Sequence, residues 1–189
     1  MQDLSLHLLD IIENSVRAGA SLVKILIDVD EKKDTLIFKI IDNGSGMDPE
    51  TLNNALNPFY TSKTSRKKKI GLGISLFKQI TELCEGSLHV ESELGKGTNL
   101  EATFKKSHID RMPIGSLADT LIGSLIGHSE TDFYLKITHN TLKQSFEYEF
   151  DTRLLKEELG DIPLTYPDVI QYIIEDVNNG IKNTKMGEI

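Results

Sequence analysis

Apolar side chains recur every four positions near the start of the chain. Leu8, Ile12 and Val16 follow this spacing, which predicts an amphipathic helix over residues 4–17 that ends before Gly19. The polar residues of the opposite face, spaced i, i+3, i+4 and i+7, are Asp10, Glu13, Asn14 and Arg17. Because these side chains project from one side of the helix, they can line a site together.

Two segments rich in β-branched residues follow, at 23–29 and 36–41, with a polar stretch between them. This pattern predicts two antiparallel strands joined as a hairpin. The second strand runs directly into Asp42 and a loop that contains two glycines, and Asp48 then caps a short helix. A strand therefore delivers Asp42 to a loop.

Residues 61–69 are rich in Lys and Arg and poor in apolar residues, which predicts a mobile basic loop. The sequence Gly71-Leu72-Gly73 ends this loop and opens a helix that contains Phe77. The unpaired amides at the start of that helix would then lie beside the basic loop. Segments 88–91 and 99–104 form a further predicted hairpin.

This order of elements predicts an α/β two-layer sandwich, with helices on one face of a mainly antiparallel or mixed sheet. Beyond a pause near residues 105–113, apolar spacing predicts a helix at Leu117, a hairpin around His139-Asn140, and helices that start at Asp151 and Pro167. We therefore divide the chain into residues 1–106 and a small α+β module, residues 107–189, with a role in protein interaction or regulation.

Composition excludes several classes of protein. The net charge of −8 and the absence of a basic stripe argue against nucleic-acid binding. Cys84 is the only cysteine, so an internal disulfide and thiolate metal clusters are excluded, and its apolar neighbours predict that it is buried. The sequence shows no signal peptide and no membrane-spanning segment, so we expect a cytoplasmic protein.

The order of the polar and glycine-rich segments is more specific than any one of them. The segments, in chain order, are Asp10-Ile11-Ile12-Glu13-Asn14, Asp42-Asn43-Gly44-Ser45-Gly46, Pro58-Phe59-Tyr60-Thr61-Ser62-Lys63, Gly71-Leu72-Gly73 and Gly95-Lys96-Gly97-Thr98. Over residues 4–105 the chain resembles the GHKL superfamily, which includes gyrase, Hsp90, histidine kinase and MutL-type ATPases. The resemblance implies the Bergerat-type ATP-binding fold.

Different segments resemble different branches of this superfamily. The spans 58–63 and 90–98 look most like the ATP-binding domain of sensor histidine kinases. The sequence Glu13-Asn14-Ser15, followed by Ala18-Gly19-Ala20, looks more like the mismatch-repair ATPases. The chain lies between these branches.

The resemblance implies ATP and Mg²⁺ as cofactors. It implies that Asn14 coordinates Mg²⁺ through its side-chain oxygen, and that Asp42 accepts a hydrogen bond from the adenine amino group. A helix-surface asparagine and a turn-capping aspartate are the plain structural alternatives. The other nucleotide-binding residues that it implies are Arg17, Gly44, Gly46, Met47, Phe59, Thr61, Lys63, Gly71, Leu72, Gly73 and Thr98.

Asp10 departs from the pattern of the superfamily. Hydrolytic members carry glutamate four residues before the metal-binding asparagine, and histidine kinases usually carry asparagine there. Asp10 is a candidate general base, or it holds the water shell of the metal. Glu13 is a weaker candidate base, and it can instead pair with Arg17 at i, i+4.

Three functions fit this resemblance. The first is a regulatory kinase that phosphorylates a histidine or serine of a partner in trans in signal transduction, since the six residues before His7 cannot form a phosphoacceptor domain. The second is an ATPase that drives a conformational switch. The third is a non-catalytic nucleotide sensor within a larger complex, including a redox or hydrogenase complex. The sequence also allows a homodimer.

Overall fold

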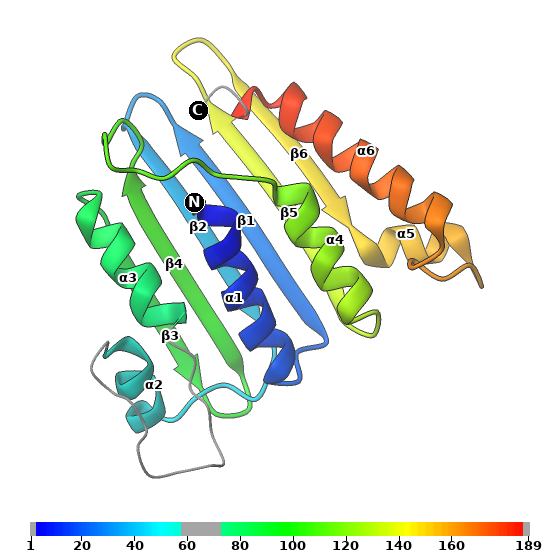
Figure 1. Cartoon of the computed structure of the whole chain (residues 1–189), viewed down its shortest axis with the longest axis horizontal. Coiled ribbons are helices and arrows are strands. Elements are labelled where there is room, and N and C mark those ends of the chain that lie inside the picture. Colours follow the sequence, from blue (N-terminus) through cyan, green and yellow to red (C-terminus); the bar gives the residue numbers. More distant parts are fainter. Residues whose placement is uncertain (1–2, 58–72, 187–189) are drawn as a thin grey trace.

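The chain folds into a six-stranded sheet with helices over one face (Figure 1). The structure is a computed structural model that describes residues 3–57 and 73–186. The elements are α1 (Leu4–Arg17), β1 (Leu22–Asp30), β2 (Thr35–Asp42), α2 (Pro49–Leu56), α3 (Gly73–Leu83), β3 (Ser87–Glu93), β4 (Gly97–Lys105), α4 (Leu117–Gly127), β5 (Asp132–Asn140), β6 (Ser145–Asp151), α5 (Thr152–Leu159) and α6 (Pro167–Asn183). The expected α/β two-layer sandwich is confirmed.

The strand order across the sheet is β3-β4-β2-β1-β5-β6. Within the described part of the chain, β1 and β5 are the one parallel pair, in register from Leu22 opposite Asp132 to Asp30 opposite Asn140. The other neighbours, including both hairpins expected before residue 106, are antiparallel. The sheet is therefore mixed, and its parallel contact joins segments far apart in the sequence.

One predicted turn is displaced. The sequence placed the turn of the last hairpin at His139-Asn140, but both residues belong to β5, and the turn lies at residues 141–144. Thr141 closes it by donating its amide hydrogen to the carbonyl oxygen of Gln144 at 2.9 Å. The strand continues through His139 because this side chain falls on the buried side of the alternation and is only 2% exposed.

Alternating burial along the strands turns one face of the sheet toward the helices. In β1 the buried residues Val23, Ile25, Ile27 and Val29 alternate with partly exposed residues of the other face. These side chains join a core that receives Leu8 from α1, as the helical spacing predicted. Cys84 is fully buried, also as predicted.

The elements after residue 107 extend this sheet and this helical layer. Helix α4 packs between α1 and α6, while β5 pairs with β1 (Figure 1). The segment before α4 also caps α1, because the amides of Leu4 and Ser5 donate to the carbonyl oxygens of Pro113 and Ile114 at 3.0 and 2.8 Å. The division of the chain into residues 1–106 and 107–189 as separate domains stays a prediction.

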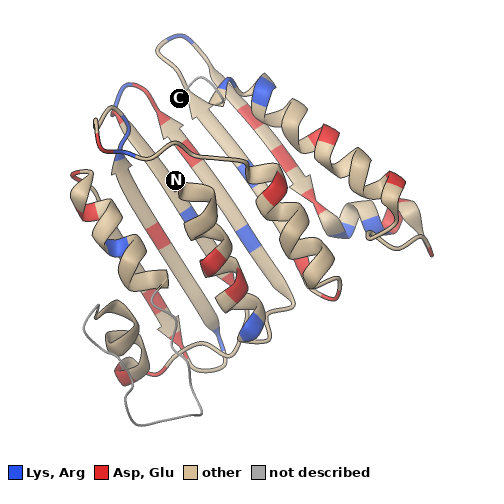
Figure 2. Cartoon of the chain, in the orientation of Figure 1, with Lys and Arg blue, Asp and Glu red and all other residues tan. Residues whose placement is uncertain are grey.

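Charged residues of both signs are interspersed over the described strands and helices (Figure 2). None of the described helices is long and apolar enough to cross a bilayer.

Candidate functional site

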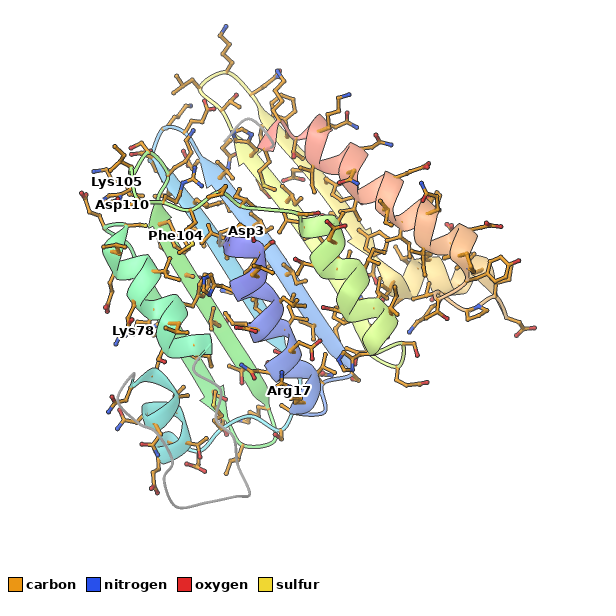
Figure 3. All side chains as sticks on the ribbon, viewed as in Figure 1. Asp3, Arg17, Lys78, Phe104, Lys105 and Asp110 are labelled. Atoms are coloured by element: carbon orange, nitrogen blue, oxygen red, sulfur yellow. The ribbon has the colours of Figure 1, made fainter. Side chains whose placement is uncertain are left out.

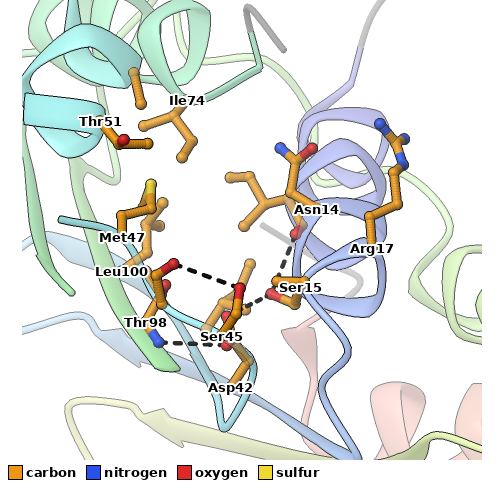
Figure 4. Close-up of a pocket in the computed structure, with 15 residues that line it drawn as sticks. Asn14, Ser15, Arg17, Asp42, Ser45, Met47, Thr51, Ile74, Thr98 and Leu100 are labelled. Atoms are coloured by element: carbon orange, nitrogen blue, oxygen red, sulfur yellow. Dashed lines mark hydrogen bonds between the residues drawn. The ribbon is translucent and has the colours of Figure 1, made fainter. Parts of the chain in front are cut away.

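A cavity of about 300 Å³ opens between α1, the end of β2, the loop after it, α2, the start of α3 and β4. Its volume lies at the lower end of the range of about 300–1,000 Å³ that is typical of small-molecule sites. The residues that line it are Ile11, Asn14, Ser15, Arg17, Ala18, Ile40, Asp42, Ser45, Gly46, Met47, Thr51, Ala55, Ile74, Thr98 and Leu100. The walls are thus mostly apolar, with a few polar groups that converge (Figure 4).

Asp42 is a buried acidic residue of this cavity, and its side chain is held by three donors. Ser15 donates its hydroxyl hydrogen to Oδ2 at 2.7 Å, and the amide of Thr98 donates to Oδ1 at 3.3 Å (Figure 4). The amide of Gly44 also donates to Oδ1, at 2.9 Å. Asp42 as a whole is only 7% exposed. Because an ionised carboxylate has about four acceptor sites, Asp42 keeps acceptor capacity toward the cavity.

Two glycines let the loop after β2 and the β3–β4 hairpin approach each other. Gly46 and Gly97 have φ angles of 64° and 95°, in the left-handed region. A Cβ atom at Gly46 would lie 2.0 Å from the carbonyl oxygen of Glu93, and one at Gly97 would lie 2.0 Å from that of Asp42. A side chain at either position would therefore push the wall of the cavity apart.

The polar face of α1 forms the opposite wall. Asn14 and Arg17 line the cavity, and Asp10 lies one turn earlier on an exposed part of the helix. The start of α3 packs closely here, since a Cβ atom at Gly73 would lie 3.3 Å from Cβ of Asp10 and 3.8 Å from Nδ2 of Asn14. The start of α3 therefore lies beside this polar face.

Glu13 does not line the cavity. Its carboxylate lies 3.9 Å from the guanidinium of Arg17, as the i, i+4 spacing predicted, and it also contacts Nε2 of His128 at 3.1 Å. This second contact comes from the end of α4 and could not be read from the sequence. Asp10 is the better exposed of the two candidate bases.

His7 lies on α1 one turn before Asp10. Its ring stacks on Phe77 of α3 at a centroid distance of 5.9 Å, and burial lowers the pKa of His7 against the opposing charges of Asp10 and Asp3. These contacts hold His7 against α3, and it is not among the residues that line the cavity.

The structure brings together only part of the residue set that the sequence predicted. Asn14, Arg17, Asp42, Gly46, Met47 and Thr98 line the cavity, while Gly44 and Gly73 border it. Phe59, Thr61, Lys63, Gly71 and Leu72 lie outside the described residues.

Ser15 and the apolar walls were not predicted from the sequence. Ser15 directly follows Asn14, and its position on the buried side of α1 was the signal that could have pointed to it. Ile40 and Leu100 face each other across β2 and β4 at the cavity. The alternation of residues along a strand predicts on which face of the sheet Ile40 and Leu100 lie, but it does not predict that a cavity lies beside them.

No group of three or more His, Cys, Asp or Glu side chains that could hold a metal ion occurs among residues 3–57 and 73–186. A metal here would have to take most of its ligands from water or from a bound phosphate. Asn14 offers an amide oxygen, which suits Mg²⁺, a hard cation that keeps several waters.

Comparison with solved structures shows the same fold elsewhere. A structure titled as the N-terminal domain of a DNA repair protein superimposes with a TM-score of 0.57 over 96% of this chain and 59% of its own, at 14% identity. At this identity the likeness concerns the fold alone. It extends past residue 108 into the C-terminal elements.

Two proteins of Bacillus subtilis (strain 168) are similar in sequence to about half of this chain. Sensor histidine kinase YvrG is 30% identical over 99 residues, which are 51% of this chain and 17% of that protein. Sporulation kinase D is 33% identical over 100 residues, which are 53% of this chain and 19% of that protein. The chain thus matches less than a fifth of the length of either relative.

The model of one protein family, described as histidine kinase-, DNA gyrase B- and HSP90-like ATPases, matches residues 2–108. The matched segment is more than half of the 189 residues and contains every element around the cavity. With its cavity at the end of β2 and its mixed α/β sandwich, the chain belongs to the family of histidine kinase-, DNA gyrase B- and HSP90-like ATPases.

Proposed function

We propose that this protein binds ATP with Mg²⁺ in the cavity and acts as a regulatory kinase on a protein partner in trans. The observation that carries the nucleotide part is the buried carboxylate of Asp42, which faces a mostly apolar cavity while three donors hold its side chain in place. A fixed acceptor in such a cavity suits a ligand that presents an amino group on a flat aromatic ring, as adenine does.

The two ends of the cavity fit the two ends of ATP. Asp42 would accept the hydrogen bond from the adenine amino group, and apolar side chains such as Ile40 and Met47 would contact the ring. Asn14 would hold Mg²⁺ on the phosphates, and Arg17 would add positive charge. The amides at the start of α3, beside Asp10 and Asn14, would face the phosphate oxygens.

Several proposed contacts fall on residues that the structure does not describe. Phe59, Thr61, Lys63, Gly71 and Leu72 keep their proposed roles at the nucleotide as predictions from the sequence.

The names of the relatives favour a kinase over the other functions. YvrG is named a sensor histidine kinase, and a second relative is named sporulation kinase D. In the proposed reaction an acceptor atom of the partner attacks the γ-phosphorus of ATP, the bond to the β-phosphate oxygen breaks, and ADP leaves.

Hydrolysis is the second candidate, and one observation favours it. Asp10 is an exposed carboxylate beside Asn14 and the start of α3, where a base could reach a water near the γ-phosphate. The carboxylate of Glu13 contacts Nε2 of His128 at 3.1 Å and lies outside the lining of the cavity, which leaves Asp10 as the better placed base.

Calorimetric titration of Mg-ATP and Mg-GTP into the wild type and Asp42→Asn tests the nucleotide site. We expect the wild type to prefer ATP and the variant to lose about tenfold or more in ATP affinity. The amide oxygen of the variant would accept from the amides of Gly44 and Thr98, and the NH₂ at the position of Oδ2 cannot accept from adenine. Asp161→Asn makes the same chemical change on an exposed loop and should leave the affinity unchanged.

If the folded wild type bound neither nucleotide, or if Asp42→Asn bound ATP as well as the wild type, the proposal would be wrong. Incubation with γ-labelled ATP then separates the two activities. Label on an added protein from a cell extract supports the kinase, whereas free labelled phosphate without a labelled protein supports the ATPase.

A further inference from the structure

A carboxylate of α1 lies between a residue that lines the cavity and a residue of the C-terminal region. Nε2 of His128, at the end of α4, lies 3.1 and 3.2 Å from the two carboxylate oxygens of Glu13. On its other side, Oε2 of Glu13 lies 3.9 Å from a guanidinium nitrogen of Arg17. One acidic group therefore has two candidate partners, and the nearer one lies outside the segment that matches the family.

The two contacts differ in closeness and in exposure. The side chains of Glu13 and His128 are 27% and 31% exposed, whereas that of Arg17 is 64% exposed. Because a carboxylate only accepts hydrogen bonds, Nε2 of His128 must carry the hydrogen. Nε2 of His128 thus lies at nearly the same distance from both oxygens of Glu13. The guanidinium of Arg17, at 3.9 Å, is too far from Glu13 for a direct hydrogen bond.

Arg17 is the member of this group that lines the cavity. It projects from the last turn of α1, on the same wall as Asn14 (Figures 3 and 4). A guanidinium that closes fully on Glu13 uses its paired donors there and is less available to a phosphate. Whether Glu13 contacts His128 or Arg17 therefore decides how far the positive charge of Arg17 is available at the cavity.

We propose that His128 is a positioning residue that occupies Glu13 and so keeps Arg17 available for the phosphates of the bound nucleotide. The proposal rests on the proposed nucleotide site. It gives the C-terminal elements a direct effect on nucleotide affinity, because His128 directly follows α4 as its C-cap residue. A shift of α4 that moves His128 away from Glu13 would let Glu13 pair with Arg17 instead.

The test is a set of variants titrated with Mg-ATP and, separately, with adenosine. In His128→Ala, Glu13 is free to pair with Arg17, and ATP affinity falls by about two- to fivefold, the range expected for an exposed ion pair. Adenosine has no phosphate and binds both proteins equally. His128→Gln keeps a donor near the position of Nε2 and restores ATP affinity.

The sharpest measurement is the double variant. Glu13→Gln removes the competing charge, so ATP affinity is at least that of the wild type. Adding His128→Ala to Glu13→Gln then has no further effect, because His128 acts only through Glu13. A residue with a merely structural role would lower affinity equally in both backgrounds and for both ligands.

The outcomes separate this inference from the proposed function. If the wild type binds ATP but His128→Ala binds it equally well, or if the loss persists beside Glu13→Gln, the positioning role is wrong and the nucleotide site stands. If adenosine affinity falls as much as ATP affinity, His128 supports the whole cavity and the inference is wrong. If the folded wild type binds neither ligand, both proposals fail.

Discussion

Buried polar side chains serve different purposes in the region of α1 to β4 and in the region of α4 to α6. In the first region Ser15 and Asp42 are hydrogen-bonded to each other at the floor of a cavity. In the second, such groups join one segment of chain to another. Thr152 accepts from the amide of Phe133 at 2.9 Å, and Nδ1 of His139 donates to the carbonyl oxygen of Thr184 at 2.7 Å.

The difference shows where the protein has a hydrogen-bond acceptor available for a ligand. A buried polar group must find a partner, because an unpaired one costs about 1–3 kcal/mol. For the hydroxyl of Thr152 and for Nδ1 of His139 the chain itself supplies partners. At Asp42 the chain supplies three donors but leaves the carboxylate facing a cavity. Predictions for the two regions should therefore differ in kind, with ligand affinity affected in one and stability in the other.

The largest expected effect tests whether the two regions unfold together. Phe133 of β5 is fully buried, and Phe133→Ala should lower the free energy of unfolding by about 3–5 kcal/mol. Because β5 pairs with β1, hydrogen exchange should speed up in β2 as well as in β6. Leu154→Ala, at a residue that is 60% exposed, should change stability by less than about 0.5 kcal/mol. Faster exchange confined to β5 and β6 would show two separate units.

A smaller effect is expected at a hydroxyl of the C-terminal region. Tyr148 of β6 donates to Oδ2 of Asp176 in α6 at 2.6 Å, so Tyr148→Phe should cost about 1–2 kcal/mol in urea unfolding and leave ATP affinity unchanged. Tyr166→Phe, at an exposed tyrosine, is the matched control. A change in ATP affinity without a change in stability would show that this hydroxyl serves ligand binding, against the expected difference between the two regions.

The same tyrosine predicts a dependence on pH. Burial, and then the hydrogen bond to Asp176, raise the pKa of Tyr148 above its ordinary value. The neutral hydroxyl is thus favoured in the folded state, and its contribution is full below about pH 10, the pKa of an unfolded tyrosine. Above that pH the wild type should lose unfolding free energy more steeply than Tyr148→Phe, and parallel curves for the two proteins would contradict this.

The smallest effect concerns a hydroxyl of the cavity. Ser15→Ala removes one of the donors to Asp42 and should weaken ATP binding by about two- to tenfold, the equivalent of one hydrogen bond of roughly 0.5–1.5 kcal/mol. Ser5→Ala is the matched control, because Ser5 lies on the same helix and donates to Asp3 at 2.7 Å, away from the cavity. Equal ATP affinities of the two variants would show that the Ser15 hydroxyl does not contribute to ATP binding.

Local patterns were enough to predict most elements. The fourfold spacing of Leu8, Ile12 and Val16 gave α1, and the Asp48 side chain caps α2 by accepting from the amide of Thr51 at 2.7 Å. The last turn was misplaced because His139 and Asn140 are polar. Buried contacts of the His139 ring, which no local pattern reveals, keep both residues in the strand.

The sequence by itself determined the elements, the family resemblance, and the polar residues of α1 and of the loop after β2. Only the tertiary structure decided that β5 lies parallel to β1, that Ser15 holds Asp42, and that His128 reaches Glu13. The physical reason is separation along the chain. Helical and strand periodicity act over a few residues, whereas these contacts join residues 27 to 115 positions apart, and packing of the whole core brings them together.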